Sequence, residues 1–183
     1  MQPLLVLPVL AFVITLTLFL LVLRRAGRFI AATRDVERFR RQVGDLAGRV
    51  EISLGEICAR VDAVRRGALG ADMVADDIAA SLDAVGQYET EARAFRPPPD
   101  GLAIRGAIVA ELERAARALE MIEHGRSIQA SARSGGREIE AQTAIKRGYL
   151  NVLHARESIA YQAKGAKELS AADDATRIRR RNA

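Results

Sequence analysis

A run of twenty uncharged residues from Leu4 to Leu23 constrains this chain more than any other feature of its sequence. A helix rises about 1.5 Å per residue, so such a run covers roughly 30 Å, which matches the hydrocarbon core of a bilayer. Pro8 lies in the first turns, where a missing amide proton costs little. The run therefore predicts a transmembrane helix at residues 4–23, preceded by a short extracytoplasmic N-terminus at residues 1–3.

The alternative interpretation of this run is a cleaved secretory signal. The apolar core of such a signal is about 7–15 residues long, which is shorter than the run observed here. No lysine or arginine precedes the run, and Arg24 and Arg25 follow Leu23 where a cleavage site made of small residues would be expected. We therefore expect the run to act as a permanent anchor.

Charge is distributed unevenly around the expected anchor. Residues 1–23 contain no lysine or arginine, whereas residues 24–41 contain seven arginines and only two acids. Positive flanks stay on the cytoplasmic side, so we expect a single-pass protein of the cell membrane with its N-terminus outside and residues 24–183 in the cytoplasm. The same side chains are candidates for contact with anionic lipid headgroups, although topology alone accounts for them. These membrane-proximal arginines are Arg24, Arg25, Arg28, Arg34, Arg38, Arg40 and Arg41.

Apolar residues recur at spacings of three and four through the rest of the chain, which is the period of amphipathic helices. Alanine is abundant and aromatic residues make up only 4% of the chain, a composition that favours helices over sheets. The sequence therefore predicts an all-α protein in which residues 24–171 form an antiparallel bundle of about four long, amphipathic, coiled-coil-like helices. The expected helices cover about residues 28–66, 71–96, 101–133 and 137–171, and residues 172–183 are expected to form a basic flexible tail.

The first of these helices carries a narrow, heptad-like apolar seam that starts almost directly after the anchor and runs from Val36 to Val64. We therefore expect one continuous helix through the membrane surface, with Gly27 as a candidate joint. Because the count of helices is even, the last one is expected to return toward the membrane and to bring the tail close to the basic segment after the anchor. The basic residues of the tail are Arg177, Arg179, Arg180 and Arg181.

Charge is also segregated between the first two expected cytoplasmic helices. Residues 71–92 contain six acids and no base, whereas the segment before them is rich in arginine. Packing the acidic helix against the basic one would satisfy both in part and would help to select which helices are neighbours. The alternative is that each helix presents a solvated face, because exposed ion pairs contribute only about 0–1 kcal/mol.

Three glycines in the first helix are candidates for a close helix contact. Gly44 and Gly48 form a Gly-x-x-x-Gly pattern, and Gly55 lies one heptad further on, roughly along one stripe beside the apolar seam. Such a stripe lets another backbone approach closely. One interpretation is packing within the chain, and the other is a homodimer, because long seams that start at a membrane often pair in parallel.

A search for catalytic chemistry finds no candidate catalytic, metal-ligating or cofactor-binding residue. His124 and His154 lack the Glu-x-x-His spacing of helical metal sites, because Met121 and Asn151 stand three residues before them. The chain contains no phosphate-binding loop, no nucleophile elbow and no zinc-protease motif. Cys58, the single cysteine, lies in the apolar seam, where burial is expected to raise its pKa rather than activate its thiol. We therefore expect no enzymatic activity and no cofactor.

Nucleic acid is not an expected partner, despite a formal net charge of +5. The positive excess lies beside the anchor and in the tail, and the aromatic residues needed to stack on single strands are scarce. The chain has 25 arginines and 3 lysines, a bias typical of GC-rich genomes that points to a bacterial source. The layout of one N-terminal anchor and a helical cytoplasmic part resembles that of LemA-type bacterial proteins in architecture, without a shared motif.

These observations predict a membrane-anchored helical scaffold or interaction protein, with the lipid bilayer and protein molecules of unknown identity as its partners. One alternative is a regulator that contacts anionic lipid through the membrane-proximal and tail arginines. Another is a transmembrane signal coupler in which the continuous helix transmits motion.

Overall fold

The structure is a computed structural model that describes residues 6–131 and 137–169. Within these ranges, the side chains of residues 6–11, 13–14, 25–32 and 131 are outside the description. The predicted N-terminus at residues 1–3 and the predicted tail at residues 172–183, with all four of its arginines, also lie outside the described residues.

All regular structure in the described part of the chain is helical, as predicted. At two places, before the second and third bundle helices, a short 3-10 segment stands where the sequence predicts the start of the α-helix. The elements in chain order are α1 (Val6–Arg65), η2 (Ala71–Val74), α2 (Ala75–Ala94), η3 (Pro99–Gly101), α3 (Leu102–Ser131) and α4 (Glu138–Glu168).

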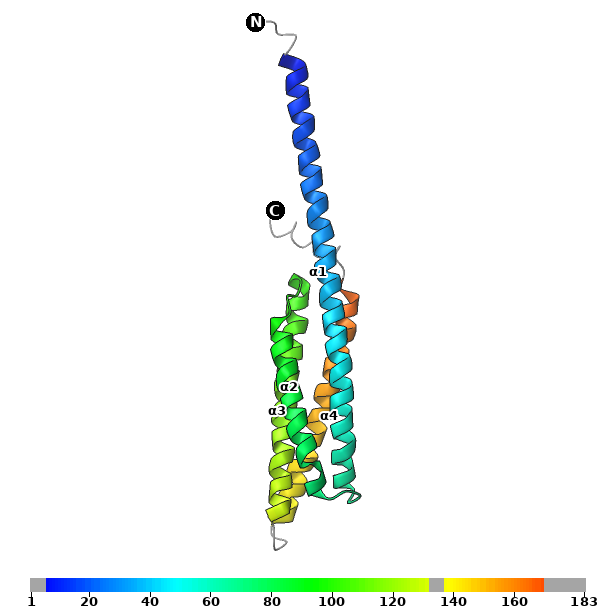
Figure 1. Cartoon of the computed structure of the whole chain (residues 1–183), viewed down its shortest axis with the longest axis vertical. Helices are drawn as coiled ribbons and strands as arrows, with labels where there is room; N and C mark the ends of the chain where they lie inside the picture. The colour runs from blue at the N-terminus through cyan, green and yellow to red at the C-terminus, as the bar shows by residue number, and fades with distance from the viewer. Residues whose placement is uncertain (1–5, 132–136, 170–183) are drawn as a thin grey trace.

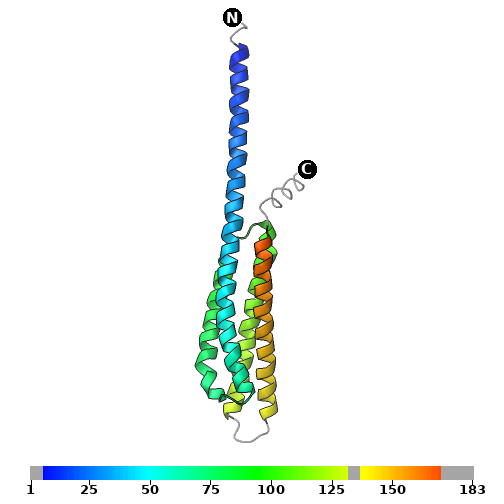
Figure 2. The same cartoon turned by 90° about the vertical axis from the view of Figure 1, so that its right-hand side faces the viewer.

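Helix α1 is a single helix of 60 residues that extends far beyond the other three (Figures 1 and 2). It passes through Gly27 without interruption, so this glycine is not a joint. Among the side chains of α1 that the structure describes, that of Val36 is the first to be buried. We call residues 24–35, the single helix between the expected anchor and the bundle, the stalk.

Among the residues that the structure describes, no helix combines the length and the apolar character that crossing a membrane requires. The transmembrane helix expected at residues 4–23 therefore stays a prediction.

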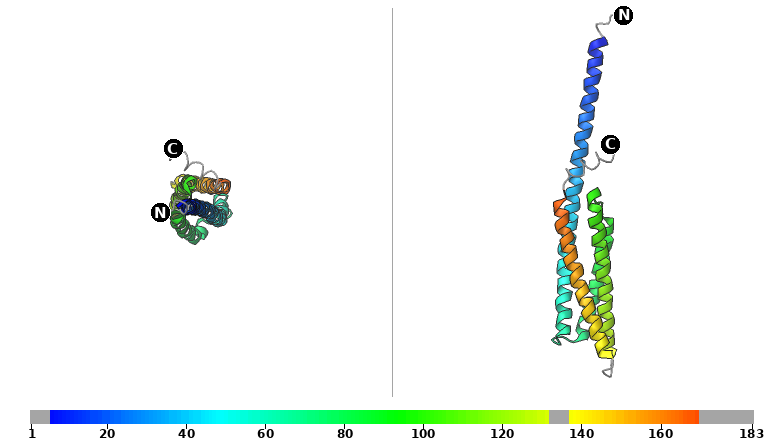
Figure 3. Two further views of the ribbon diagram at one scale, coloured as in Figure 1. Left: turned by 90° about the horizontal axis from the view of Figure 1, so that it is seen from above. Right: turned by 180° about the vertical axis from the view of Figure 1, so that it is seen from behind.

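The four helices form a ring in which each contacts two neighbours. Helix α1 packs against α2 and α4, and α3 packs against α2 and α4, so α2 and α4 lie diagonally across the bundle (Figure 3). Neighbouring helices are antiparallel. Helix α4 therefore ends beside the part of α1 where the stalk joins the bundle (Figure 2). This is the return toward the expected anchor that the even number of helices predicted.

The predicted seam of α1 faces the core. Eight seam residues are at most 3% exposed, and Val64 at the end of the seam is partly buried. The eight are Val36, Phe39, Val43, Leu46, Val50, Leu54, Ile57 and Val61. Alanine fills much of the remaining core on α3 and α4, including Ala115, Ala155 and Ala166, which are fully buried. Small core side chains allow helices to approach closely, and α3 and α4 make the most extensive contact in the bundle.

The turn after α1 is closed by a glycine. The sequence offers Gly67 or Gly70 as the stop, and it is Gly67 that adopts a positive φ of 73°, a conformation that other residues rarely take. The backbone amide of Ala68 then donates a hydrogen bond to the carbonyl of Ala63 at 2.9 Å. The turn after α2 contains the predicted break at residues 97–99, and Pro98 is buried there.

Candidate interaction surfaces

The membrane-proximal arginines lie on the exposed stalk and the first turns of the bundle. Two of them are partly neutralised by acids of the same helix, and a third donates a hydrogen bond to its backbone. Arg38 forms an ion pair with Asp35 at 3.4 Å and Arg40 forms one with Glu37 at 3.3 Å, while Arg41 donates to the backbone carbonyl of Glu37. Arg24 and Arg34 are exposed, and the side chains of Arg25 and Arg28 lie outside the description.

The glycine stripe of α1 makes little contact within the chain. A Cβ atom added at Gly44 or Gly48 would meet no atom within 4 Å, and one added at Gly55 would meet only the end of the Arg156 side chain, at 3.5 Å. Close packing of these glycines inside the bundle is therefore not observed. A homodimer through this stripe stays a prediction.

Two other glycines provide the close helix contact. A Cβ atom at Gly125 on α3 would lie 2.8 Å from the carbonyl oxygen of Ala141, and one at Gly148 on α4 would lie 2.6 Å from that of Ala118. Each glycine therefore receives the backbone of the opposite helix. The sequence signal was their place in the apolar pattern: Gly125 follows Ile122 by three residues, at a core position of its helix.

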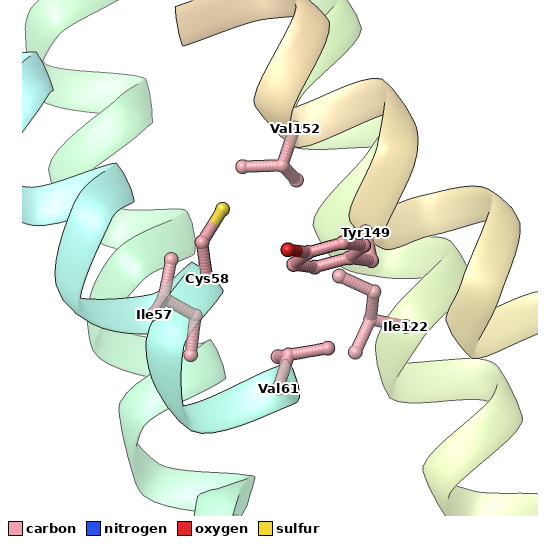
Figure 4. Close-up of a pocket in the computed structure, with 6 residues that line it drawn as sticks. All are labelled: Ile57, Cys58, Val61, Ile122, Tyr149 and Val152. Atoms are coloured by element: carbon pink, nitrogen blue, oxygen red, sulfur yellow. The ribbon is translucent and has the colours of Figure 1, made fainter. Parts of the chain in front are cut away.

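Cys58 lies in an apolar niche between α1, α3 and α4 (Figure 4). The lining residues are Ile57, Cys58, Val61, Ile122, Tyr149 and Val152. The cysteine is 6% exposed, and burial in these surroundings raises the pKa of its thiol to about 11. The predicted burial of the thiol is confirmed. The guanidinium of Arg65 covers the outer side of the niche, 4.6 Å from the centre of the Tyr149 ring.

The two histidines are exposed and lie on different helices. His124 is near the charged group of Arg126 and Glu123 on α3, where a hydrogen bond from Arg126 lowers the pKa of the Glu123 carboxyl. Among the described residues, no group of three His, Cys, Asp or Glu side chains is placed to hold a metal ion. The structure therefore offers no ligand cluster that the sequence search overlooked.

Ion pairs join α1 to both of its neighbours. On the α2 side, Arg49 donates two hydrogen bonds to the Glu91 carboxylate, at 2.6 and 2.7 Å, and Arg60 pairs with Asp77. On the α4 side, the acid is on α1: Glu51 pairs with Arg156 at 3.4 Å. The acidic helix thus packs against the basic one. The paired side chains of α1 and α2 remain 39–47% exposed, so each pair contributes little energy and acts mainly on which helices are neighbours.

Exposed apolar side chains outside the expected anchor are concentrated on α4. Ile139, Leu150 and Tyr161 are 80%, 51% and 71% exposed. They are spaced by eleven residues, which is close to three helical turns, and therefore lie on one side of the helix. The spacing of apolar residues predicts that Ile139 shares the buried side of this helix with Ile145 and Val152. This is wrong, because Ile139 lies with Leu150 and Tyr161 on the opposite side of α4.

Compared with the models of protein families, with curated proteins and with solved structures, the chain matches none. The likeness to LemA-type proteins therefore stays one of layout. The fold is a four-helix bundle in which one helix extends beyond the other three. The interaction surfaces described above are the features from which a function can be proposed.

Proposed function

We propose that this protein is a scaffold anchored to the cell membrane by residues 4–23, which presents its helical bundle to protein partners in the cytoplasm and has no catalytic role. The observation that carries the proposal is the contrast between the two ends of α1. One end is buried in the bundle along its seam, and the other projects as an apolar helix that no other described part of the chain covers.

The projecting end is apolar on every side. Leu20, Leu21, Val22 and Leu23 occupy a full helical turn, and each is more than half exposed. A helix that is apolar all round needs an apolar environment, because every exposed Å² costs about 25 cal/mol in water. A bilayer supplies that environment, and the arginines that follow Leu23 favour the cytoplasmic side for the bundle.

The bundle itself suits an interaction role. Its interior is filled by apolar side chains, and the niche at Cys58 has an apolar lining that offers no polar group to orient a substrate except the Tyr149 hydroxyl. Its outer faces differ in charge, as the ion pairs between helices show, and in side-chain size, as the exposed Ile139, Leu150 and Tyr161 of α4 show. Binding through such faces requires no chemistry beyond burial of apolar surface and charge matching.

Membrane fractionation tests the anchor. The full chain is expected to stay in the membrane pellet after alkaline carbonate extraction, whereas a variant with Leu18→Arg and Leu21→Arg is expected to be released. The matched control is Ile52→Arg, which places a charge at an exposed position of α1 inside the bundle and should leave the chain in the pellet.

Topology needs a second measurement. A tag fused after residue 183 is expected to resist protease added to intact cells and to be cleaved after lysis. Accessibility of the tag in intact cells, or a mature chain that starts after Leu23, would contradict the proposal.

A second candidate function, contact with anionic lipid, is favoured by the position of the end of α4. Helix α4 ends at the end of the bundle from which the stalk projects, on the side that faces the expected anchor (Figure 2). Replacing Arg177, Arg179, Arg180 and Arg181 by serine should then weaken binding of the full chain to vesicles that contain phosphatidylserine. No change in binding would leave the scaffold as the sole candidate.

A further inference from the structure

The exposed side of α4 is both apolar and basic. Beside Ile139, Leu150 and Tyr161 it carries three exposed cations, and among the described residues none of the three forms an ion pair. Most arginines of the bundle are paired, so these free cations are unusual. We call this surface the α4 face; it comprises Ile139, Lys146, Arg147, Leu150, His154, Glu157, Tyr161 and Lys164.

The exposed side of α2 has the opposite character. Its side chains are small or polar, its two acids form no ion pair in the described part of the chain, and a Cβ atom added at Gly86 would meet nothing within 4 Å. This surface is flat and negatively charged. We call it the α2 face; it comprises Asp76, Ala79, Ala80, Asp83, Gly86, Gln87 and Thr90.

The two faces point in opposite directions. Helices α2 and α4 are diagonal in the bundle, and both run from the far turns toward the stalk (Figure 3). The α4 face of one molecule can therefore meet the α2 face of another when both molecules stand in the same orientation. Copies whose anchors share one membrane have that orientation.

Contacts with α1 show which parts of α2 and α4 lie at the same height. Each of these helices touches α1 near the far turn and again nearer the stalk. The contacts that fix the heights are Arg60–Asp77 and Cys58–Tyr149 near the far turn, and Arg49–Glu91 and Glu51–Arg156 nearer the stalk. Between its contacts α2 advances from residue 77 to 91 while α1 runs back from 60 to 49. Helix α4 advances from residue 149 to 156 while α1 runs back from 58 to 51, so positions on α2 and α4 are matched by interpolation along α1.

At matched heights the two faces are complementary. Asp76 on α2 is level with Arg147 on α4, so opposite charges meet. Leu150 is level with the small side chains at residues 79–80, which leave room for it. Glu157, the acid of the α4 face, is level with the hydroxyl of Thr90 near the stalk end of the bundle rather than with an aspartate.

We infer that copies of this chain associate side by side in the membrane, with the α4 face of one copy on the α2 face of the next. The contact uses different surfaces on the two copies, so it does not close into a dimer and instead extends into an open row. A single pair of helix faces is a small interface. It suffices here because the anchor of the proposed function concentrates the copies and holds them at one height.

Cysteine crosslinking tests this arrangement in the full chain. In a Cys58→Ala background, one tagged chain carries Thr90→Cys and a second, differently tagged chain carries Glu157→Cys; both are expressed together and oxidised in isolated membranes. We expect the mixed disulfide to exceed either same-residue disulfide at least fivefold. A chain that carries both cysteines should give a ladder of dimers, trimers and larger species.

The main competing arrangement is a closed dimer through the glycine stripe of α1. Gly48→Cys in the same background reports on it, because a two-fold contact along that stripe would join this cysteine to its own copy. A strong Gly48→Cys self-crosslink, a ladder that stops at the dimer, or equal mixed and same-residue disulfides would overturn the inference.

Charge reversal tests the pairing itself. Asp76→Lys with Asp83→Lys should lower the mixed disulfide at least fivefold, and adding Lys146→Glu with Arg147→Glu should restore it. All four positions are exposed, so circular dichroism should show an unchanged helix content. A mixed disulfide that is insensitive to the reversal would overturn the charge pairing.

Fractionation of the same samples separates the two proposals. Chains in the membrane pellet without a mixed disulfide overturn the row and leave the anchored scaffold intact. Chains in the soluble fraction overturn the anchor, and with it the row that depends on it.

Discussion

The rings of Phe39 and Phe95 meet edge to face, with their centroids 6.3 Å apart and their planes at 87°. Phe39 is on α1 and Phe95 directly follows α2, and both are at most 4% exposed. A Cβ atom at Gly101, in η3, would lie 2.8 Å from the Phe39 ring. The Phe39 ring therefore joins three segments and closes the end of the bundle from which the stalk projects.

Removing the Phe39 ring should lower the stability of the bundle. Phe39→Ala is expected to lower the free energy of unfolding by about 3–5 kcal/mol, because it removes a fully buried aromatic side chain and leaves a cavity between three segments. Denaturant unfolding of the full chain in detergent micelles, followed by circular dichroism, measures the change. The control is Phe12→Ala, which alters a ring that is 68% exposed and should change the stability of the bundle by less than about 0.5 kcal/mol.

Alanine substitutions should separate the glycines that receive a neighbouring helix from those that do not. Gly148→Ala is expected to destabilise the bundle by about 1–3 kcal/mol, because the new methyl group would overlap the Ala118 carbonyl. Gly106→Ala, at an exposed position of α3 with no atom within 4 Å, should instead stabilise it by up to about 1 kcal/mol. The same unfolding measurement compares the two, and equal effects would contradict the close approach of α3 and α4.

The ion pair between Arg49 and Glu91 should contribute little to stability. A double-mutant cycle with Arg49→Gln and Glu91→Gln is expected to give a coupling energy of about 1 kcal/mol or less, because both side chains are more than 40% exposed. The coupling should fall further in about 1 M salt. A coupling above about 2 kcal/mol would mean that the pair is shielded from solvent.

Cys58 should be slow to react and should make stability depend on pH in the alkaline range. The pKa of the folded thiol is about 11, against an ordinary value of 9.0, so the contribution of Cys58 is fully present below about pH 9 and is lost as the pH rises toward 11. Wild-type stability should therefore fall more steeply than that of Cys58→Val between these values. Maleimide labelling at pH 7.5 should be slow in the folded chain and fast after unfolding.

Much of the fold follows from local pattern. The spacing of Val36, Phe39 and Val43 marks the buried side of α1, and the proline run at residues 97–99 marks a break that no helix crosses. The even number of helices then decides that α4 returns to the stalk. Burial of Cys58 follows from its neighbours in the seam, because Leu54, Ile57 and Val61 lie on the same side of α1 and are all buried.

Which helices pack closely against each other is harder to predict from the sequence. The Gly44–Gly48 pattern is the more visible one in the sequence, yet the close contact occurs at Gly125 and Gly148, which are 23 residues apart on different helices. Spacing along one helix shows which residues share a side but not which side faces which neighbour. The α2 and α4 faces were missed for the same reason: their relation depends on the diagonal placement of two helices.

The stalk has a consequence for the membrane surface. With residues 4–23 in the bilayer, its twelve helical residues hold the first bundle layer about 18 Å from the hydrocarbon, whereas the headgroup region is only about 5–7 Å deep. A water layer roughly 10 Å thick would separate lipid from bundle, crossed by one slender helix per molecule. Lipids would diffuse freely beneath even a crowded array, and an incoming ligand would reach the headgroups without displacing any subunit.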